Sequence, residues 1–129
     1  MTGMILLIED DPFWASLITK MLTPAAVLVA RNGVEGLEMF GRKRFELVIT
    51  DLVMPEKDGL ATIVDIRKLD ASLPVIAISG GGNIGAQGDL LKIAMQVGAT
   101  TTLAKPFGRD ALMTKVREYL PELTAGSQS

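Results

Sequence analysis

The sequence contains neither cysteine nor histidine among its 129 residues. The absence of cysteine excludes disulfide bonds, and the two absences together exclude a zinc site built from thiolate and imidazole ligands. The absence of histidine also excludes acid–base catalysis by an imidazole of this chain. These absences are compatible with a cytoplasmic protein, which is the location we expect.

Excess positive charge and long apolar segments are absent as well. The net charge is −2, and no basic block of the kind carried by nucleic-acid-binding proteins is present, so we expect no nucleic-acid partner. The first apolar run, residues 4–8, is too short for a signal peptide or a membrane span, so we expect no membrane partner. The length and a hydrophobic content of 48% fit one domain with a sizeable core.

What the sequence does contain is a regular alternation of short apolar runs and helical patterns. Five runs are typical of buried strands, because they are rich in Val, Ile and Leu and are bounded by turn signals. We place them at 4–8, 26–30, 46–50, 74–78 and 100–104. This alternation predicts an α/β fold in which a parallel sheet is covered by helices.

Capping and breaking residues indicate where the helices begin and end. Asp11 followed by Pro12 predicts a helix start, because aspartate caps the first turn and proline fits the next position. That helix is expected to stop near Pro24, and the third helix is expected at about 59–69. Trp14 is interpreted as a packing residue or a contact at the rim of a pocket.

One segment is rich in glycine, with five glycines among residues 80–88. Glycine disfavours both helix and strand, so we expect a mobile loop there. The fourth helix is then expected to begin near Asp89.

Polar side chains stand at the carboxyl ends of four of the five predicted strands. They are Glu9, Asp10 and Asp11, then Asp51, then Ser79, and then Lys105. Because such ends share one edge of a parallel sheet, we expect these side chains to converge, although Asp11 is better explained as the helix cap. Clustered carboxylates repel one another unless a cation is present, and oxygen ligands suit Mg²⁺. A carboxylate can also act as a nucleophile and form an aspartyl-phosphate.

Several motifs, taken in their order and spacing, resemble the receiver domain of two-component response regulators. The matching stretches are Ile-Leu-Leu-Ile-Glu-Asp-Asp at 5–11, Asn-Gly-Val-Glu-Gly-Leu at 32–37, Asp-Leu-Val-Met-Pro-Glu-Lys-Asp-Gly at 51–59, Leu-Pro-Val-Ile-Ala-Ile-Ser at 73–79, Gly-Ala at 98–99 and Lys-Pro-Phe at 105–107. The resemblance implies a flavodoxin-like fold: a single doubly wound sheet of five parallel strands in the order 2-1-3-4-5, with five helices. It places the receiver domain at 4–120, followed by a short polar tail at 121–129.

The resemblance also implies a role for each polar residue at the sheet edge. Asp51 would accept the phosphoryl group and also bind Mg²⁺ (or Mn²⁺). Asp10 would be a direct ligand of that ion, Glu9 would hold it through water, and the backbone carbonyl of Val53 would be a further ligand. Lys105 would pair with a phosphoryl oxygen.

The remaining implied roles concern the switch. Ser79 would be the hydroxyl that swings toward the phosphate. Relatives usually carry an aromatic residue three positions before the lysine, and here that position is Thr102, so no ring can report the change. We therefore count Thr102 and the glycine-rich segment, Gly80, Gly81 and Gly82, among the switch residues together with Ser79. The hypothesis is that the glycine-rich segment orders when phosphate is bound.

The function that the resemblance implies is a phosphoryl-accepting switch. Its partners would be a histidine kinase or histidine phosphotransfer protein and an unknown downstream protein, and it would act as a monomer or weak homodimer. It would catalyse only its own phosphorylation and dephosphorylation, so it would not be a turnover enzyme. The alternatives are a degenerate receiver that only binds proteins and a receiver fragment of a longer regulator. A phosphatase is improbable, because Val53 stands where a second acid would be needed.

Overall fold

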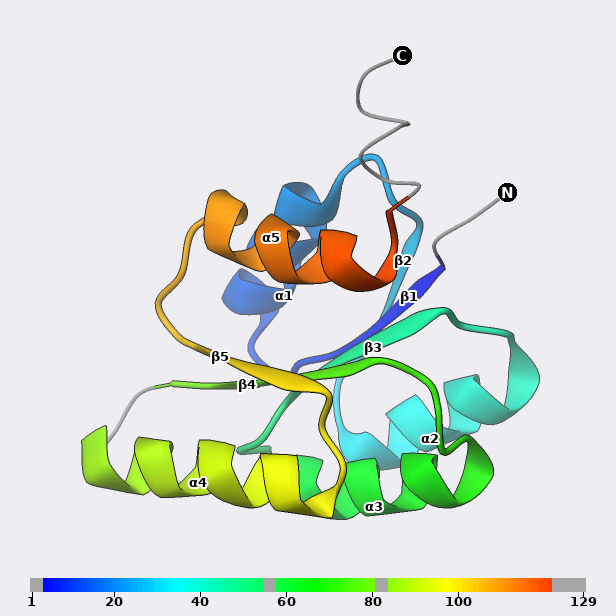
Figure 1. Ribbon diagram of the computed structural model, residues 1–129. Helices are drawn as coiled ribbons and strands as arrows, with labels where there is room; N and C mark the ends of the chain where they lie inside the picture. Colours follow the sequence, from blue (N-terminus) through cyan, green and yellow to red (C-terminus); the bar gives the residue numbers. More distant parts are fainter. Residues whose placement is uncertain (1–3, 55–57, 81–83, 122–129) are drawn as a thin grey trace.

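A computed structural model describes residues 4–54, 58–80 and 84–121 of the chain. Within these ranges, strands and helices alternate strictly (Figure 1). The strands are β1 (Ile5–Ile8), β2 (Val27–Ala30), β3 (Leu47–Asp51), β4 (Val75–Ser79) and β5 (Thr101–Ala104). The helices are α1 (Pro12–Leu22), α2 (Gly33–Arg42), α3 (Gly59–Leu69), α4 (Ile84–Val97) and α5 (Arg109–Tyr119).

The five strands form one parallel sheet in the order β2-β1-β3-β4-β5. In its register, Ile8 of β1 lies beside Ala30 and Thr50, and Ser79 of β4 lies beside Ala104. The carboxyl ends of the strands therefore share one edge, and the residues that follow them meet there. The expected flavodoxin-like fold, with this strand order and five helices, is confirmed.

Helices cover both faces of the sheet, with α1 and α5 on one face and α2, α3 and α4 on the other (Figure 1). On β1, Ile5 and Leu7 pack in the apolar cluster that includes α1 and α5, whereas Leu6 and Ile8 pack in the opposite cluster. All four side chains are fully buried. Burial on both faces explains why the strands appear in the sequence as continuous apolar runs.

Side chains cap the starts of α1 and α3, and the cap of α1 is the one that the sequence indicated. The carboxylate of Asp11 accepts a hydrogen bond from the backbone N–H of Phe13 at 2.9 Å, and Asp58 accepts one from Ala61 at 2.8 Å. Helix α1 ends at Leu22, one residue before a cis peptide bond to Pro24. The predicted helix start at Pro12 and the predicted bounds of the third helix are thus confirmed.

The fourth helix begins earlier than the sequence predicted. We expected residues 80–88 to form a loop, but α4 starts at Ile84 and includes Gly85 and Gly88. Residues 81–83 lie outside the described part of the chain. Each glycine in a helix costs roughly 1 kcal/mol relative to alanine, yet tertiary packing supplies most helix stability. Ala94 is fully buried against the sheet, so packing of the later turns outweighs the low propensity of the first ones.

Residues 122–129, which make up most of the expected polar tail, lie outside the described part. Within residues 4–54, 58–80 and 84–121, no helix has both the length and the hydropathy of a transmembrane segment.

Candidate functional site

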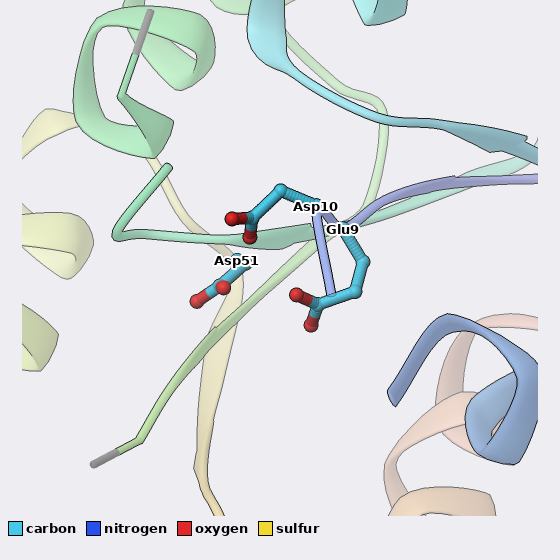
Figure 2. A group of neighbouring side chains, drawn as sticks. All are labelled: Glu9, Asp10 and Asp51. Carbon is cyan, nitrogen blue, oxygen red and sulfur yellow. The ribbon is translucent and has the colours of Figure 1, made fainter. Parts of the chain in front are cut away.

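Three carboxylates gather at the carboxyl edge of the sheet. Glu9 and Asp10 follow β1 directly, and Asp51 is the last residue of β3. Each contributes one oxygen to a group in which all three atoms lie within 4.8 Å of one another, and Figure 2 shows the side chains gathered in this way. Glu9 and Asp51 are buried, whereas Asp10 is exposed. The convergence expected from the strand ends is therefore present for these acids.

Backbone amides hold the carboxylate of Asp51 in one orientation. Its Oδ1 accepts a hydrogen bond from the N–H of Leu52 at 2.8 Å and a longer one from Val53 at 3.4 Å. Its other oxygen, Oδ2, lies 3.6 Å from Nζ of Lys105. One oxygen is thus bound by the loop that follows β3, and the other is turned toward the ammonium.

The start of α3 packs directly on the backbone of Asp51. A Cβ added at Gly59 would lie 2.1 Å from the carbonyl oxygen of Asp51 and 2.6 Å from Cα of Leu52. The N–H of Gly59 also donates to the carbonyl of Leu52 at 3.1 Å. Only a residue without a side chain allows this approach, which explains the glycine at the first position of the helix.

Lys105 reaches two of the three acids. Its Nζ lies 2.8 Å from Oε1 of Glu9 and 3.6 Å from Oδ2 of Asp51, and its side chain is 11% exposed. Its backbone N–H donates to the carbonyl of Ser79 at 2.7 Å, so the ends of β4 and β5 are joined at this residue. The peptide bond to Pro106 is cis. The lysine is therefore a largely buried cation between two carboxylates.

For Glu9, the cost of burying the carboxylate outweighs the stabilising effect of Lys105. The pKa of Glu9 is raised from 4.5 to about 7, mainly because burial disfavours the charged carboxylate. The ammonium of Lys105 and the N–H of Asp11 oppose this rise, whereas the charge of Asp51 adds to it. The three acids are hard oxygen donors in a small space, which is the donor set that Mg²⁺ prefers. The residues present therefore fit a divalent cation.

A pocket of about 300 Å³ opens beside the lysine. It is lined by Asp11, Trp14, Gly80, Lys105 and Pro106. Trp14 lines this pocket and also packs against the apolar cluster under α1 and α5, so both sequence interpretations hold, but neither included its contact with Lys105. The ammonium lies 4.9 Å from the centroid of the indole ring. The only available signal was that Trp14 falls on the first turn of a helix that starts beside the acids.

Two other residues near the acids have backbone roles. Asp11 caps α1, as expected, and donates its own N–H to Oε2 of Glu9 at 3.2 Å. Val53 donates its N–H to Asp51 and has an exposed side chain. Its expected role as a metal ligand through the carbonyl stays a prediction.

The expected switch residues belong to β4, to β5 and to the segment that follows β4. Ser79 is the last residue of β4 and is buried. Thr102 is partly buried in β5, and Gly80 follows β4 directly. Gly81 and Gly82 lie outside the described part of the chain. The switch role of all five residues stays a prediction.

Comparison with known proteins gives one consistent result. A family model described as "Response regulator receiver domain" matches residues 5–117. The chemotaxis protein CheY of Halobacterium salinarum is 30% identical over 122 residues, which cover 93% of this chain and 98% of that protein. A response regulator receiver domain protein from Clostridium thermocellum has a solved structure with a TM-score of 0.83 and 27% identity, covering 96% of this chain and 98% of that one.

Longer regulators are similar to this chain over part of their length. The transcriptional regulatory protein GlrR of Escherichia coli is 35% identical over 120 residues, which cover 92% of this chain but 26% of that protein. The chain spans about a quarter or less of the length of several such regulators.

Proposed function

This chain belongs to the family of response regulator receiver domains, and from that membership we propose that it switches state when Asp51 accepts a phosphoryl group. The observation that supports this proposal is the meeting of Asp51 with Glu9, Asp10 and Lys105 at one edge of the sheet. The receiver domain would comprise residues 4–120, with residues 121–129 as a tail.

The proposed reaction is a transfer between two nucleophiles. An oxygen of Asp51 forms a bond to phosphorus while the bond from phosphorus to a histidine nitrogen of the donor breaks, and the imidazole leaves with the electron pair. Oδ2 is the proposed acceptor, because Oδ1 is held by the amides of Leu52 and Val53. Lys105, 3.6 Å from Oδ2, neutralises charge that develops on the phosphoryl oxygens.

The same residues would hold a divalent cation, Mg²⁺ or Mn²⁺. Asp10 and Asp51 would be direct ligands, Glu9 would act through water, and the carbonyl of Val53 would be a further ligand. The ion would supply positive charge against the repulsion of the carboxylates and the phosphoryl group. The gathering of three carboxylate oxygens within 4.8 Å of one another supports this assignment, because a cation among them would offset their mutual repulsion.

We propose that the signal leaves the site through the ends of β4 and β5. The carbonyl of Ser79 is bonded to the N–H of Lys105, so a movement of either residue reaches the other. Thr102 has no aromatic ring that could change orientation. We propose that ordering of residues 80–82 when phosphate is bound carries the signal in its place. The partners would be a histidine kinase or histidine phosphotransfer protein and a downstream protein. The chain would act in the cytoplasm, as a monomer or weak homodimer. Such a chain acts on itself and does not turn over a substrate.

Labelling by a small phosphodonor tests the proposal. The wild-type chain is expected to become phosphorylated in the presence of Mg²⁺, and Asp51→Asn is expected to abolish labelling. Asp11→Asn is the matched control, because asparagine caps a helix as well as aspartate does and the residue lies beside the same pocket. Absence of labelling in the wild-type chain would favour the alternative of a receiver that only binds proteins. Labelling that survives Asp51→Asn would show that Asp51 is not the acceptor.

The alternative of a longer regulator is compatible with the same chemistry. The chain matches the receiver portion of proteins such as GlrR over about a quarter of their length. Because the described acids and the lysine all lie within residues 9–105, the receiver domain alone would supply the accepting side of the proposed transfer.

A further inference from the structure

Lys105 has a third neighbour that the proposed transfer does not use, namely Trp14. The ammonium lies 4.9 Å from the centroid of the indole ring. An ammonium within about 6 Å of a ring centroid is attracted by the electron-rich face, and the attraction grows when water is excluded. The side chain of Lys105 is 11% exposed, so most of the water has been removed.

We propose that Trp14 is a positioning residue for Lys105, whose ring keeps the ammonium between Glu9 and Asp51 before and during phosphoryl transfer. This inference rests on the proposed function, because it assigns a residue to the same site.

The stem of the lysine is confined by a second wall. A Cβ added at Gly80 would lie 2.3 Å from Cβ of Lys105 and 2.7 Å from its Cδ. The backbone of Gly80 therefore lies directly against the methylene chain. Gly80, Trp14 and Lys105 also line the same pocket. The long side chain is held in a slot between Gly80, which follows β4, and Trp14 of helix α1.

Trp14 also packs against two other aromatic rings. Its ring lies 5.3 Å from that of Phe107, measured between centroids, and 6.2 Å from that of Phe13 in an edge-to-face arrangement. Phe107 follows Lys105 by two residues, so the ring that contacts the ammonium also contacts the segment that carries it. The cap of Asp11 sets the start of α1 three residues earlier. The position of the indole is therefore tied to the position of the lysine.

An aromatic face suits this task better than a further acid. The ammonium lies 2.8 Å from Glu9 and 3.6 Å from Asp51, and during transfer it must follow the charge that develops near Asp51. A carboxylate or carbonyl would bind the ammonium along one direction and compete with the phosphoryl oxygens. The attraction of a ring face is less directional and adds no negative charge. The ammonium can therefore shift between the two acids without leaving the ring.

The test compares two substitutions of Trp14 that differ in the ring. Trp14→Leu keeps an apolar side chain but removes the ring face, and Trp14→Phe keeps an aromatic face. With saturating Mg²⁺ and a small phosphodonor, we expect the phosphorylation rate constant to fall about three- to tenfold in Trp14→Leu, the range that a partly desolvated cation–π contact gives. We expect Trp14→Phe to retain at least half of the wild-type rate.

A double-mutant cycle separates positioning from general damage to the fold. In a Lys105→Met background, Trp14→Leu is expected to cause no further loss of rate, because its effect acts through the lysine. Equal rates in Trp14→Leu and Trp14→Phe, or a full loss from Trp14→Leu that persists without the lysine, would overturn the proposal.

A spectroscopic measurement keeps the inference separate from the proposed function. In the wild-type chain, the ε-methylene protons of Lys105 are expected upfield of their usual NMR position because of the indole ring current. That shift should disappear in Trp14→Leu and persist in part in Trp14→Phe. Unshifted wild-type protons would overturn the positioning role whether or not Asp51 is labelled. Shifted protons with no labelling of the wild-type chain would instead count against the proposed function alone.

Discussion

Glu9 and Lys105 form an ion pair at 2.8 Å although two strands, β3 and β4, separate their own strands in the sheet. The lysine, which follows β5, thus reaches across the edge of the sheet to the acid that follows β1. The same Nζ atom lies 3.6 Å from Oδ2 of Asp51. Lys105 therefore contacts both Glu9 and Asp51. A substitution of Glu9 or Lys105 is expected to change the electrostatic surroundings of Asp51.

The first prediction concerns pH and metal-free protein. Because burial raises the pKa of Glu9 to about 7 from 4.5, the folded chain holds a proton between these values that the unfolded chain has lost. The free energy of unfolding is therefore expected to fall as pH rises from about 4.5 to 7, by an amount on the order of a few kcal/mol, and to level off above that range. Denaturant titrations in a chelator at several pH values measure this.

Glu9→Gln is expected to flatten that pH dependence, because glutamine carries no titrating proton. Glu38→Gln, at an exposed position of α2, removes the same charge and should leave the slope unchanged. Mg²⁺ should stabilise the wild-type chain more at pH 8 than at pH 6. An identical slope in wild type and Glu9→Gln would mean that Glu9 is not the group responsible.

The second prediction concerns removal of the lysine charge. Lys105→Met leaves Glu9 buried without its cation and frees the carboxylates for a metal ion. We expect phosphorylation to slow by at least tenfold, because no ammonium then neutralises the phosphoryl oxygens. We also expect Mg²⁺ to bind more tightly, which isothermal titration measures. Weaker Mg²⁺ binding in Lys105→Met would show that the lysine organises the acids rather than competing with the ion.

The third prediction concerns the wall of the lysine slot. In Gly80→Ala the added Cβ would meet three carbons of the Lys105 side chain, so the lysine must leave its position. We expect phosphorylation to slow about tenfold and stability to fall by about 1–3 kcal/mol. Gly41→Ala is the matched control, since that position in α2 has open space around it, and a small gain in stability is expected there. Equal labelling of the two variants would contradict the role assigned to the slot.

The fourth prediction concerns the contact between α3 and Asp51. In Gly59→Ala the new Cβ would meet backbone atoms of Asp51 and Leu52, which cannot rotate out of the way. We expect a loss of about 3 kcal/mol or more in the free energy of unfolding. Chemical denaturation measures it, with Gly41→Ala again as the reference. A loss below 1 kcal/mol would show that the start of α3 can move without cost.

Much of the fold could be predicted from the sequence because its signals are local. The strand runs are continuous because both faces of the sheet are covered, and Asp11 before Pro12 marks a helix start wherever the rest of the chain lies. The start of α4 could not be predicted in this way. Glycine lowers helix propensity locally, whereas the packing of Ala94 that favours α4 depends on the assembled sheet.

The sequence was enough to predict where the candidate site lies, but not which side chains contact one another within it. Strand ends that share an edge were enough to bring Glu9, Asp10 and Asp51 together. The closer pairing of Lys105 with Glu9 than with Asp51 depends on side-chain length and rotamer, which no spacing rule contains. The contact of Trp14 with the ammonium likewise appears only when α1 and the end of β5 are placed in space.

The amides of Leu52 and Val53, which hold one oxygen of Asp51, would also select which oxygen accepts the phosphoryl group in the proposed transfer. A carboxylate in water has two equivalent oxygen atoms, and rotation about its bond to the side chain exchanges their positions. Here the loop after β3 has removed that symmetry before any donor arrives. The loss of rotational freedom accompanies folding, so a donor would meet a single preset nucleophile.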